Sequence, residues 1–259
     1  MSRPAISDDR PTRSQVAGFL EDLDREGRLL AAAAAAAGPG ADVPPCPGWR
    51  VRDLVRHIGA VHRWAATLVA RRAATPPPLD DPPEPADEEL VSWYRDSHRL
   101  VVDTLAAAPA DLDCWTFHTA PSPSPLAFWA RRQAHETAVH RYDAERARGG
   151  EPSPIERDFA VDGIDELLRG FHTRDRSRLR SERPRVVRVR AVDAGPDAVW
   201  TVRLTDRPAV AVRAVEGEAD AELSGPADQL YLALWNRTDV PRVTGDPALA
   251  ALWRERSGI

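Results

Sequence analysis

Segments rich in proline and glycine divide the first 150 residues of this chain into four stretches with helical spacing of apolar residues. Proline removes a backbone donor and glycine is a weak helix former, so helices end at such segments. We therefore expect helices over residues 12–37, 51–72, 87–107 and 126–148. Two of the connections are long and proline-rich, which favours a four-helix bundle with at least one crossover connection.

The sequence after residue 150 has a different pattern. Residues 155–174 keep helical spacing, and alternation of apolar and polar residues then predicts strands. The expected strands cover 186–192, 198–204, 209–215 and 219–223, followed by short helices at 226–235 and 247–254. Strands combined with separate helices are typical of α+β domains. The expected fold class is therefore α+β, with a four-helix bundle at 1–150 and a small α+β domain at 151–259.

The composition restricts the classes of partner. The formal net charge is −5, which argues against a nucleic-acid-binding surface. An arginine-rich run at 174–190 is interpreted as a solvated face. No apolar stretch reaches about 18 residues, and the start lacks the apolar segment of a secretory signal, so we expect a cytoplasmic protein with no membrane contact. Cys46 and Cys114 are too few for a disulfide framework and are expected to be unpaired thiols.

One helix face in the stretch 126–148 carries a candidate metal-binding pair. Glu136 and His140 are four residues apart, so their side chains emerge about 40° apart on the helix, on the face that also holds Trp129 and Gln133. A carboxylate facing a bundle interior is costly unless a positive group meets it. Carboxylate and neutral imidazole are both good ligands for zinc and similar ions. The alternative is a carboxylate paired with an arginine beside a structural histidine.

A third ligand has to come from another helix. His135 is five residues from His140, and the two diverge by about 140° on one helix, so we expect His135 to be structural. The helix at 51–72 offers His57 and His62, which lie at opposite margins of its apolar stripe. Helical geometry does not choose between them.

Four segments of the chain carry a resemblance to a known family. They are CPGWRVRDLVRHIGAVHRW, FWARRQAHETAVHRYDAE, DFAVDGIDELL and the pair LSGPADQLYLALWNR and VTGDPALAALW. Together they resemble the mycothiol-dependent maleylpyruvate isomerase family, a branch of the DinB-like metal-binding bundles. The C-terminal part is similar to sterol-carrier-like domains. The resemblance covers nearly the whole chain, in order.

The resemblance implies a set of site residues. The family's metal ligands fall on His57, Glu136 and His140, and it is the resemblance that selects His57 over His62. An arginine of the family's C-terminal domain takes part in activity, and Arg237 is the matching position. Asp143, one turn after His140, is in place to orient a ligand, or to pair with an arginine.

The resemblance also implies a reaction. A divalent metal, zinc or a similar ion, and mycothiol would be the cofactors, and three protein ligands would leave a coordination position for the thiol. The metal-activated thiolate would add to a cis alkene and leave after rotation, converting maleylpyruvate to fumarylpyruvate. A mycothiol S-transferase acting on another electrophile, and a non-catalytic binder of small apolar ligands, are the alternatives. All 35 basic residues are arginine, as expected for the GC-rich bacteria that make mycothiol. The sequence leaves the oligomeric state open.

Overall fold

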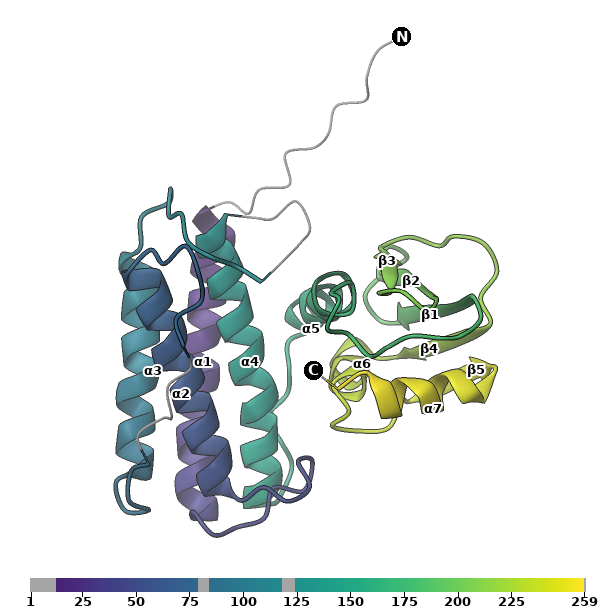
Figure 1. Cartoon of the computed structure of the whole chain (residues 1–259). Coiled ribbons are helices and arrows are strands. Elements are labelled where there is room, and N and C mark those ends of the chain that lie inside the picture. Colours follow the sequence, from purple (N-terminus) through teal and green to yellow (C-terminus); the bar gives the residue numbers. More distant parts are fainter. Residues whose placement is uncertain (1–12, 79–83, 118–123, 259) are drawn as a thin grey trace. The chain divides into compact units, whose positions relative to one another are not determined.

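The computed structural model describes residues 13–78, 84–117 and 124–258. The chain divides between Pro152 and Ser153 into two compact units. Figure 1 shows a helical first unit and a second unit that combines a sheet with helices. Within the described residues, no helix has both the length and the apolar character that a membrane span requires.

In the part of the first unit that the structure describes there are four helices, and the four predicted helices are confirmed. They are α1 (Arg13–Ala37), α2 (Val51–Ala70), α3 (Leu90–Ala107) and α4 (Pro125–Arg148). Their bounds follow the proline and glycine signals closely, because these residues act locally on the backbone. The largest difference is at the start of α3, where residues 87–89 form a turn before the helix.

Helices α2 and α3 run parallel. Gly59 packs against the ring of Trp93, and one turn further along both helices Arg63 Nε donates to Ser97 Oγ over 2.7 Å. Two consecutive helices that run parallel require the chain between them to return along the bundle. The predicted crossover is therefore confirmed, and it lies between α2 and α3.

Helix α4 runs between α1 and α2 and carries buried charge. Arg141 is fully buried, and a buried guanidinium requires anionic partners. Its Nε donates to Glu26 of α1 over 2.6 Å, and its Nη1 donates to Glu145 over 2.7 Å. On the other side of α4, Trp64 of α2 packs edge-on against Trp129. These contacts fix α4 against both neighbours, and α4 is the helix that bears two of the candidate ligands.

The second unit is built on a five-stranded sheet of order β3-β2-β1-β4-β5. Only β1 and β4 are parallel, and Val189 of β1 lies between Trp200 of β2 and Leu223 of β4. The elements are α5 (Arg157–Asp165), η1 (Glu166–Phe171), β1 (Arg185–Ala191), β2 (Val199–Leu204), β3 (Val210–Val212), β4 (Ala221–Gly225), α6 (Ala227–Leu234), β5 (Arg242–Gly245) and α7 (Pro247–Arg256). The whole chain is therefore an α+β protein, as predicted.

Three details of the second unit differ from the prediction. The helix expected at 155–174 is α5 followed by a π-helical turn, η1, and it ends at Phe171. Strand β3 keeps only three of the expected residues, because just those pair with β2. Strand β5 was not predicted: its four residues are all exposed, so it has no alternating pattern, and its pairing with β4 alone defines it.

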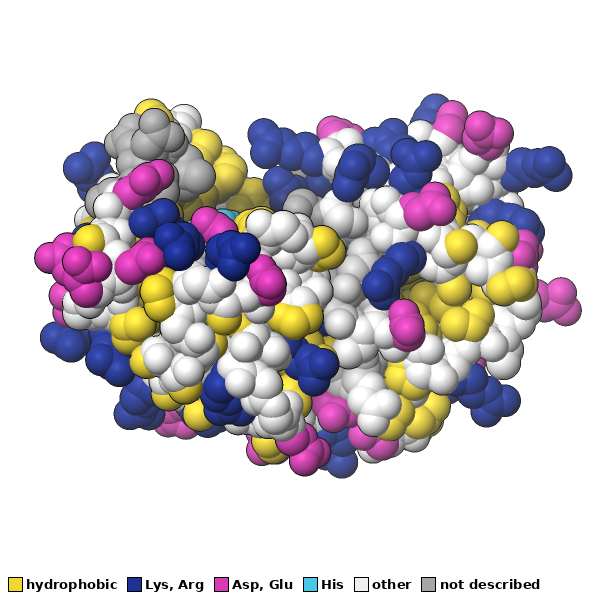
Figure 2. Space-filling model, turned by 90° about the horizontal axis from the view of Figure 1, so that it is seen from below, with side chains coloured by type: hydrophobic (Ala, Val, Ile, Leu, Met, Phe, Trp, Pro, Cys, Tyr) yellow, Lys and Arg dark blue, Asp and Glu magenta, His cyan; other side chains and the backbone are white. Residues whose placement is uncertain are grey.

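Acidic side chains neutralise part of the arginine-rich run 174–190. Arg185 contacts Asp220 at 3.2 Å and Asp246 at 2.6 Å, and Arg190 contacts Glu222 at 3.3 Å. Figure 2 shows arginine side chains interspersed with acidic ones over the face seen from below. The strand part of the run is therefore a charge-paired surface.

Candidate metal centre

A tight loop at residues 38–50 leads into the helix that carries His57. Val43 N–H donates to Trp49 carbonyl over 2.9 Å, and Val51 N–H donates to Ala41 carbonyl over 2.9 Å, which folds the loop back on itself. Gly48 has a φ of +88°, a conformation that glycine adopts without strain. The loop thereby holds the indole of Trp49 beside the first turns of α2.

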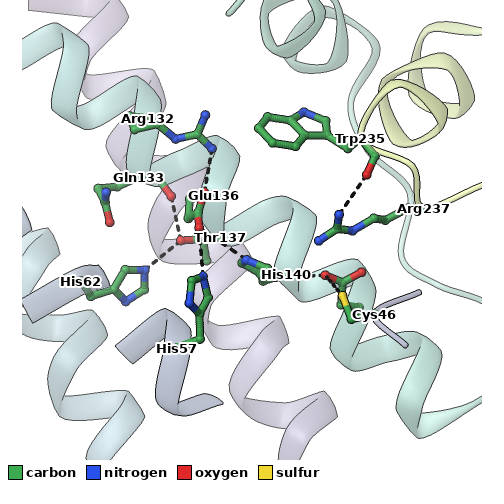
Figure 3. A network of polar contacts seen from close by, with 11 residues as sticks. Cys46, His57, His62, Arg132, Gln133, Glu136, Thr137, His140, Trp235 and Arg237 are labelled. Atoms are coloured by element: carbon green, nitrogen blue, oxygen red, sulfur yellow. Dashed lines mark hydrogen bonds and ion pairs between the residues drawn. The ribbon is translucent and has the colours of Figure 1, made fainter. Parts of the chain in front are cut away.

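Three side chains from two helices converge on one point. His57 Nε2 lies 3.4 Å from Glu136 Oε1, and His140 Nε2 lies 3.4 Å from the same oxygen. One possible ligand atom from each of the three residues lies within 4.8 Å of the other two. Figure 3 shows both imidazole rings directed at the Glu136 carboxylate. The structure thus brings together the three residues that the sequence resemblance selected.

Two further charged groups hold this triad in place. Arg132 Nη2 donates to the second oxygen of Glu136, Oε2, over 3.1 Å, which leaves Oε1 directed at the two histidines. His140 Nδ1 lies 2.9 Å from Asp143 Oδ2, so Asp143 fixes the ring and turns Nε2 toward Glu136. The arginine pairing that the sequence left open is therefore present, and a second histidine, His57, also reaches Glu136.

The charges around the triad strongly shift the pKa values of Glu136 and His140. Burial alone would raise the pKa of Glu136, but hydrogen bonds from His140 and His57 and the charge of Arg132 hold it well below its ordinary value. Burial alone would lower the pKa of His140, but Asp143 and Glu136 outweigh it and raise that pKa to about 9. The two carboxylates therefore favour the protonated form of the His140 ring.

Two residues of the 38–50 loop border the triad and were not predicted as part of the site. The indole of Trp49 stacks on the His140 ring at 6.3 Å and meets the His57 ring edge-on at 5.2 Å. Cys46 Sγ lies 3.4 Å from Asp143 Oδ2, the oxygen that also holds His140. The Pro-Gly turn between them, just before α2, is the sequence signal from which a fold-back of the loop could have been expected. Neither cysteine of the chain forms a disulfide.

The other two histidine candidates are engaged elsewhere. His62 is fully buried, and its Nε2 lies 2.9 Å from Thr137 Oγ1, which itself donates to Gln133 carbonyl. Burial and the neighbouring His98 keep the pKa of His62 well below its ordinary value. His135 is also fully buried, and its ring meets Phe19 of α1 edge-on.

Arg237 belongs to the second unit. It follows α6 in a turn where Asn236 has a φ of +61°, and its own N–H donates to Leu232 carbonyl over 2.9 Å. Its guanidinium Nη1 donates to Trp235 carbonyl over 2.9 Å. The turn is further held by Asn236 Nδ2, which donates to Ser257 Oγ over 3.0 Å. The backbone carrying Arg237 is therefore well braced within its own unit.

The donor set fits a divalent ion. At zinc–ligand distances near 2.0–2.2 Å, two ligands of a tetrahedral ion lie roughly 3.3–3.6 Å apart. The two separations of 3.4 Å between the histidine nitrogens and Glu136 Oε1 are of that size. Two imidazoles and a carboxylate also match the preferences of zinc and its neighbours in ligand type. A carboxylate that orients a histidine ligand, as Asp143 does here, is a usual companion of such sites.

Comparison with known proteins gives one consistent family. The family model described as the mycothiol maleylpyruvate isomerase N-terminal domain matches residues 20–145. The model of the corresponding C-terminal domain matches residues 158–252. No curated protein sequence matches the chain significantly.

A solved structure has the same fold. It is the crystal structure of a histidine-to-alanine mutant of the mycothiol-dependent maleylpyruvate isomerase, with a TM-score of 0.57 and 11% sequence identity. The match covers 86% of this chain and 90% of the other. At this identity, the likeness concerns the fold.

Proposed function

This chain belongs to the mycothiol-dependent maleylpyruvate isomerase family, and on that premise we propose that it is a metal- and mycothiol-dependent cis–trans isomerase. The observation that carries the proposal is the convergence of His57 and His140 on a single oxygen of Glu136. A structural ion-pair cluster would be complete with Arg132, Glu136, His140 and Asp143. Such a cluster does not require His57. The side chain of His57 is 40% exposed, yet its ring is directed at the same oxygen of Glu136.

We assign the metal to His57, Glu136 and His140. When bound there, a divalent ion such as zinc lowers the pKa of a coordinated thiol, and mycothiol supplies the sulfur that adds reversibly to an activated cis double bond. The three protein ligands carry one negative charge in total, so a divalent centre keeps a net positive charge that favours a thiolate. Loading the site requires His140 to release the proton on Nε2.

Each neighbouring side chain then has a defined task. Asp143 accepts from His140 Nδ1 and keeps Nε2 pointing into the site. Arg132 occupies Glu136 Oε2 and leaves Oε1 for the metal. The indole of Trp49 packs against both imidazole rings and limits their reorientation. We propose that Arg237 binds a carboxylate of the substrate, since a guanidinium recognises carboxylates in a bidentate manner.

The reaction needs no net change in the substrate's atoms. Addition of the thiolate to one alkene carbon would turn the double bond into a single bond and move its π electron pair onto the conjugated carbonyl as an enolate. After rotation, the enolate would return the electron pair as the thiolate leaves, and this would restore the double bond as trans. Maleylpyruvate would leave as fumarylpyruvate. We expect this to occur in the cytoplasm, where mycothiol is kept reduced.

Turnover of maleylpyruvate tests the proposal. Full-length protein loaded with zinc should isomerise maleylpyruvate only when mycothiol is present, and removal of the metal by a chelator should abolish the activity. Glu136→Gln keeps the shape of the side chain and removes its charge, so it should reduce turnover by orders of magnitude. Absence of turnover by the loaded wild-type protein would contradict the isomerase assignment.

Two other functions remain as outcomes of the same assay. A mycothiol S-transferase would use the same triad, and it would consume mycothiol with a generic electrophile while leaving maleylpyruvate unchanged. A binder of small apolar ligands would turn over neither compound. Its Glu136→Gln variant would bind the apolar ligand as well as the wild type does.

A further inference from the structure

The second unit contains a cavity of about 270 Å³ whose lining residues all belong to that unit. It lies at the loop that follows η1. Its lining, here called the arginine pocket, consists of Phe171, His172, Arg174, Arg176, Ser177, Arg178 and Gly258. A volume of this size suits a small metabolite or a part of one.

The arginine pocket has an unbalanced positive charge. Three of its lining residues are arginines, and none of the residues lining it is acidic. Arg176 and Arg178 make no hydrogen bond or ion pair with any residue that the structure describes. Arg174 packs its guanidinium on the Phe171 ring, and burial together with the charge of Arg176 lowers its pKa. Like charges around one cavity repel, and an anion bound among them would relieve that repulsion.

The loop that carries these arginines is fixed by another arginine. Arg180 donates to the backbone carbonyls of Ser177, Asp175 and Asp206 over 3.2, 2.8 and 2.9 Å. The carboxylate of Asp175 is exposed and does not line the pocket. The backbone that carries the arginines is thus fixed before any ligand binds, which lowers part of the entropic cost of binding.

A buried histidine adds a polar group. His172 is 1% exposed, and its Nδ1 lies 3.3 Å from Ser177 Oγ. That hydroxyl accepts from Leu179 N–H, so its own hydrogen is available for Nδ1. The other ring nitrogen, Nε2, is buried and has no hydrogen-bond partner among the described residues.

We propose that the arginine pocket binds a small oxyanion, the carboxylate or phosphate group of a metabolite. Guanidinium groups recognise both chemistries through paired N–H donors. The first part of the arginine-rich run therefore has a role that the second part lacks, because Arg185 and Arg190 are already paired with acidic residues. The proposal does not depend on the metal site.

Isothermal titration of the full-length protein with two probes, inorganic phosphate and succinate, tests this site. We expect saturable binding of at least one probe at one equivalent per chain. Replacing both Arg176 and Arg178 by alanine should weaken it by about tenfold or more, since each guanidinium would donate charge-assisted hydrogen bonds to the anion. Binding of phosphate alone, or of succinate alone, identifies the source of the oxyanion.

Two control variants make the result specific. Arg183→Ala removes an exposed arginine from the same run but outside the lining, and it should bind the probe as the wild type does. Glu136→Gln should also bind it normally, which separates this site from anion binding at a metal. No saturable binding up to about 10 mM of either probe, or an equal loss in Arg183→Ala, would overturn the proposal.

Discussion

Asp143 Oδ2 lies 2.9 Å from His140 Nδ1, and this contact sets which ring nitrogen of His140 faces Glu136. Asp143 is fully buried, so the contact is shielded from water and the ring has one orientation. The same oxygen accepts from the thiol of Cys46, which links the 38–50 loop to the candidate ligand.

Removal of this carboxylate should weaken metal binding without removing a ligand. We expect Asp143→Ala to lower the affinity for zinc by roughly 10–100-fold, the usual effect of losing a carboxylate that orients a histidine ligand. Asp143→Asn keeps an accepting oxygen and should lose less. Competition with a chromophoric zinc chelator measures both affinities.

Cys46→Ala is the matched control for that experiment. It removes a second group bonded to Asp143 Oδ2, and it should leave zinc affinity nearly unchanged because a thiol is a weak hydrogen-bond donor. Wild-type zinc affinity in Asp143→Ala would contradict the orienting role of Asp143.

Gly59 permits the close approach of α2 to α3. A Cβ at this position would collide with the Trp93 ring, so Gly59→Ala should destabilise the protein by about 1–3 kcal/mol despite the better helix propensity of alanine. Gly18→Ala is the control, since no atom lies within 4 Å of its added Cβ, and it should stabilise the protein by up to about 1 kcal/mol. Urea unfolding followed by circular dichroism compares the two. Equal effects of the two substitutions would show that the packing against Trp93 is unimportant.

The free energy of unfolding should decrease as the pH is lowered, because a buried histidine of the second unit resists protonation. Burial lowers the pKa of His172 to about 4. The unfolded chain binds a proton near pH 6.5 and the folded chain does not, so the contribution of His172 is complete above pH 6.5 and decreases as the pH falls toward 4. The loss at pH 5 is about 2 kcal/mol.

Calorimetric melting of wild type and His172→Gln between pH 7.5 and 5 isolates this contribution. The other titratable groups are the same in both proteins and contribute equally to both slopes. The difference between the two slopes therefore belongs to His172. The wild-type melting temperature should decrease more steeply below pH 6.5 than that of the variant. Parallel slopes would refute the account of His172.

The helices of the first unit could be predicted because their ends depend on local residues. The prolines after Arg72 and the glycines at 149–150 oppose continuation of a helix, and Pro125 begins α4 because proline is tolerated in the first helical turn. Strand β5 could not be predicted in this way. It exists because Arg242–Gly245 pairs with β4, a contact between distant residues that no local pattern records.

The candidate site was predictable in part. Helical spacing placed Glu136 and His140 on one face, but the choice of His57 over His62 required the family resemblance. In the structure the difference comes from tertiary contacts, since His62 faces Thr137 inside the bundle. The contribution of Trp49 was missed because a loop, not a helix, brings it to the triad.

The metal content of purified variants tests the central claim most directly. Elemental analysis of wild type and His62→Gln should give about one divalent ion per chain, whereas His57→Ala should have lost most of it while its circular dichroism stays that of a folded protein. His57 is partly exposed, so its truncation should leave the bundle intact. Full metal occupancy in folded His57→Ala would contradict the triad and the function built on it.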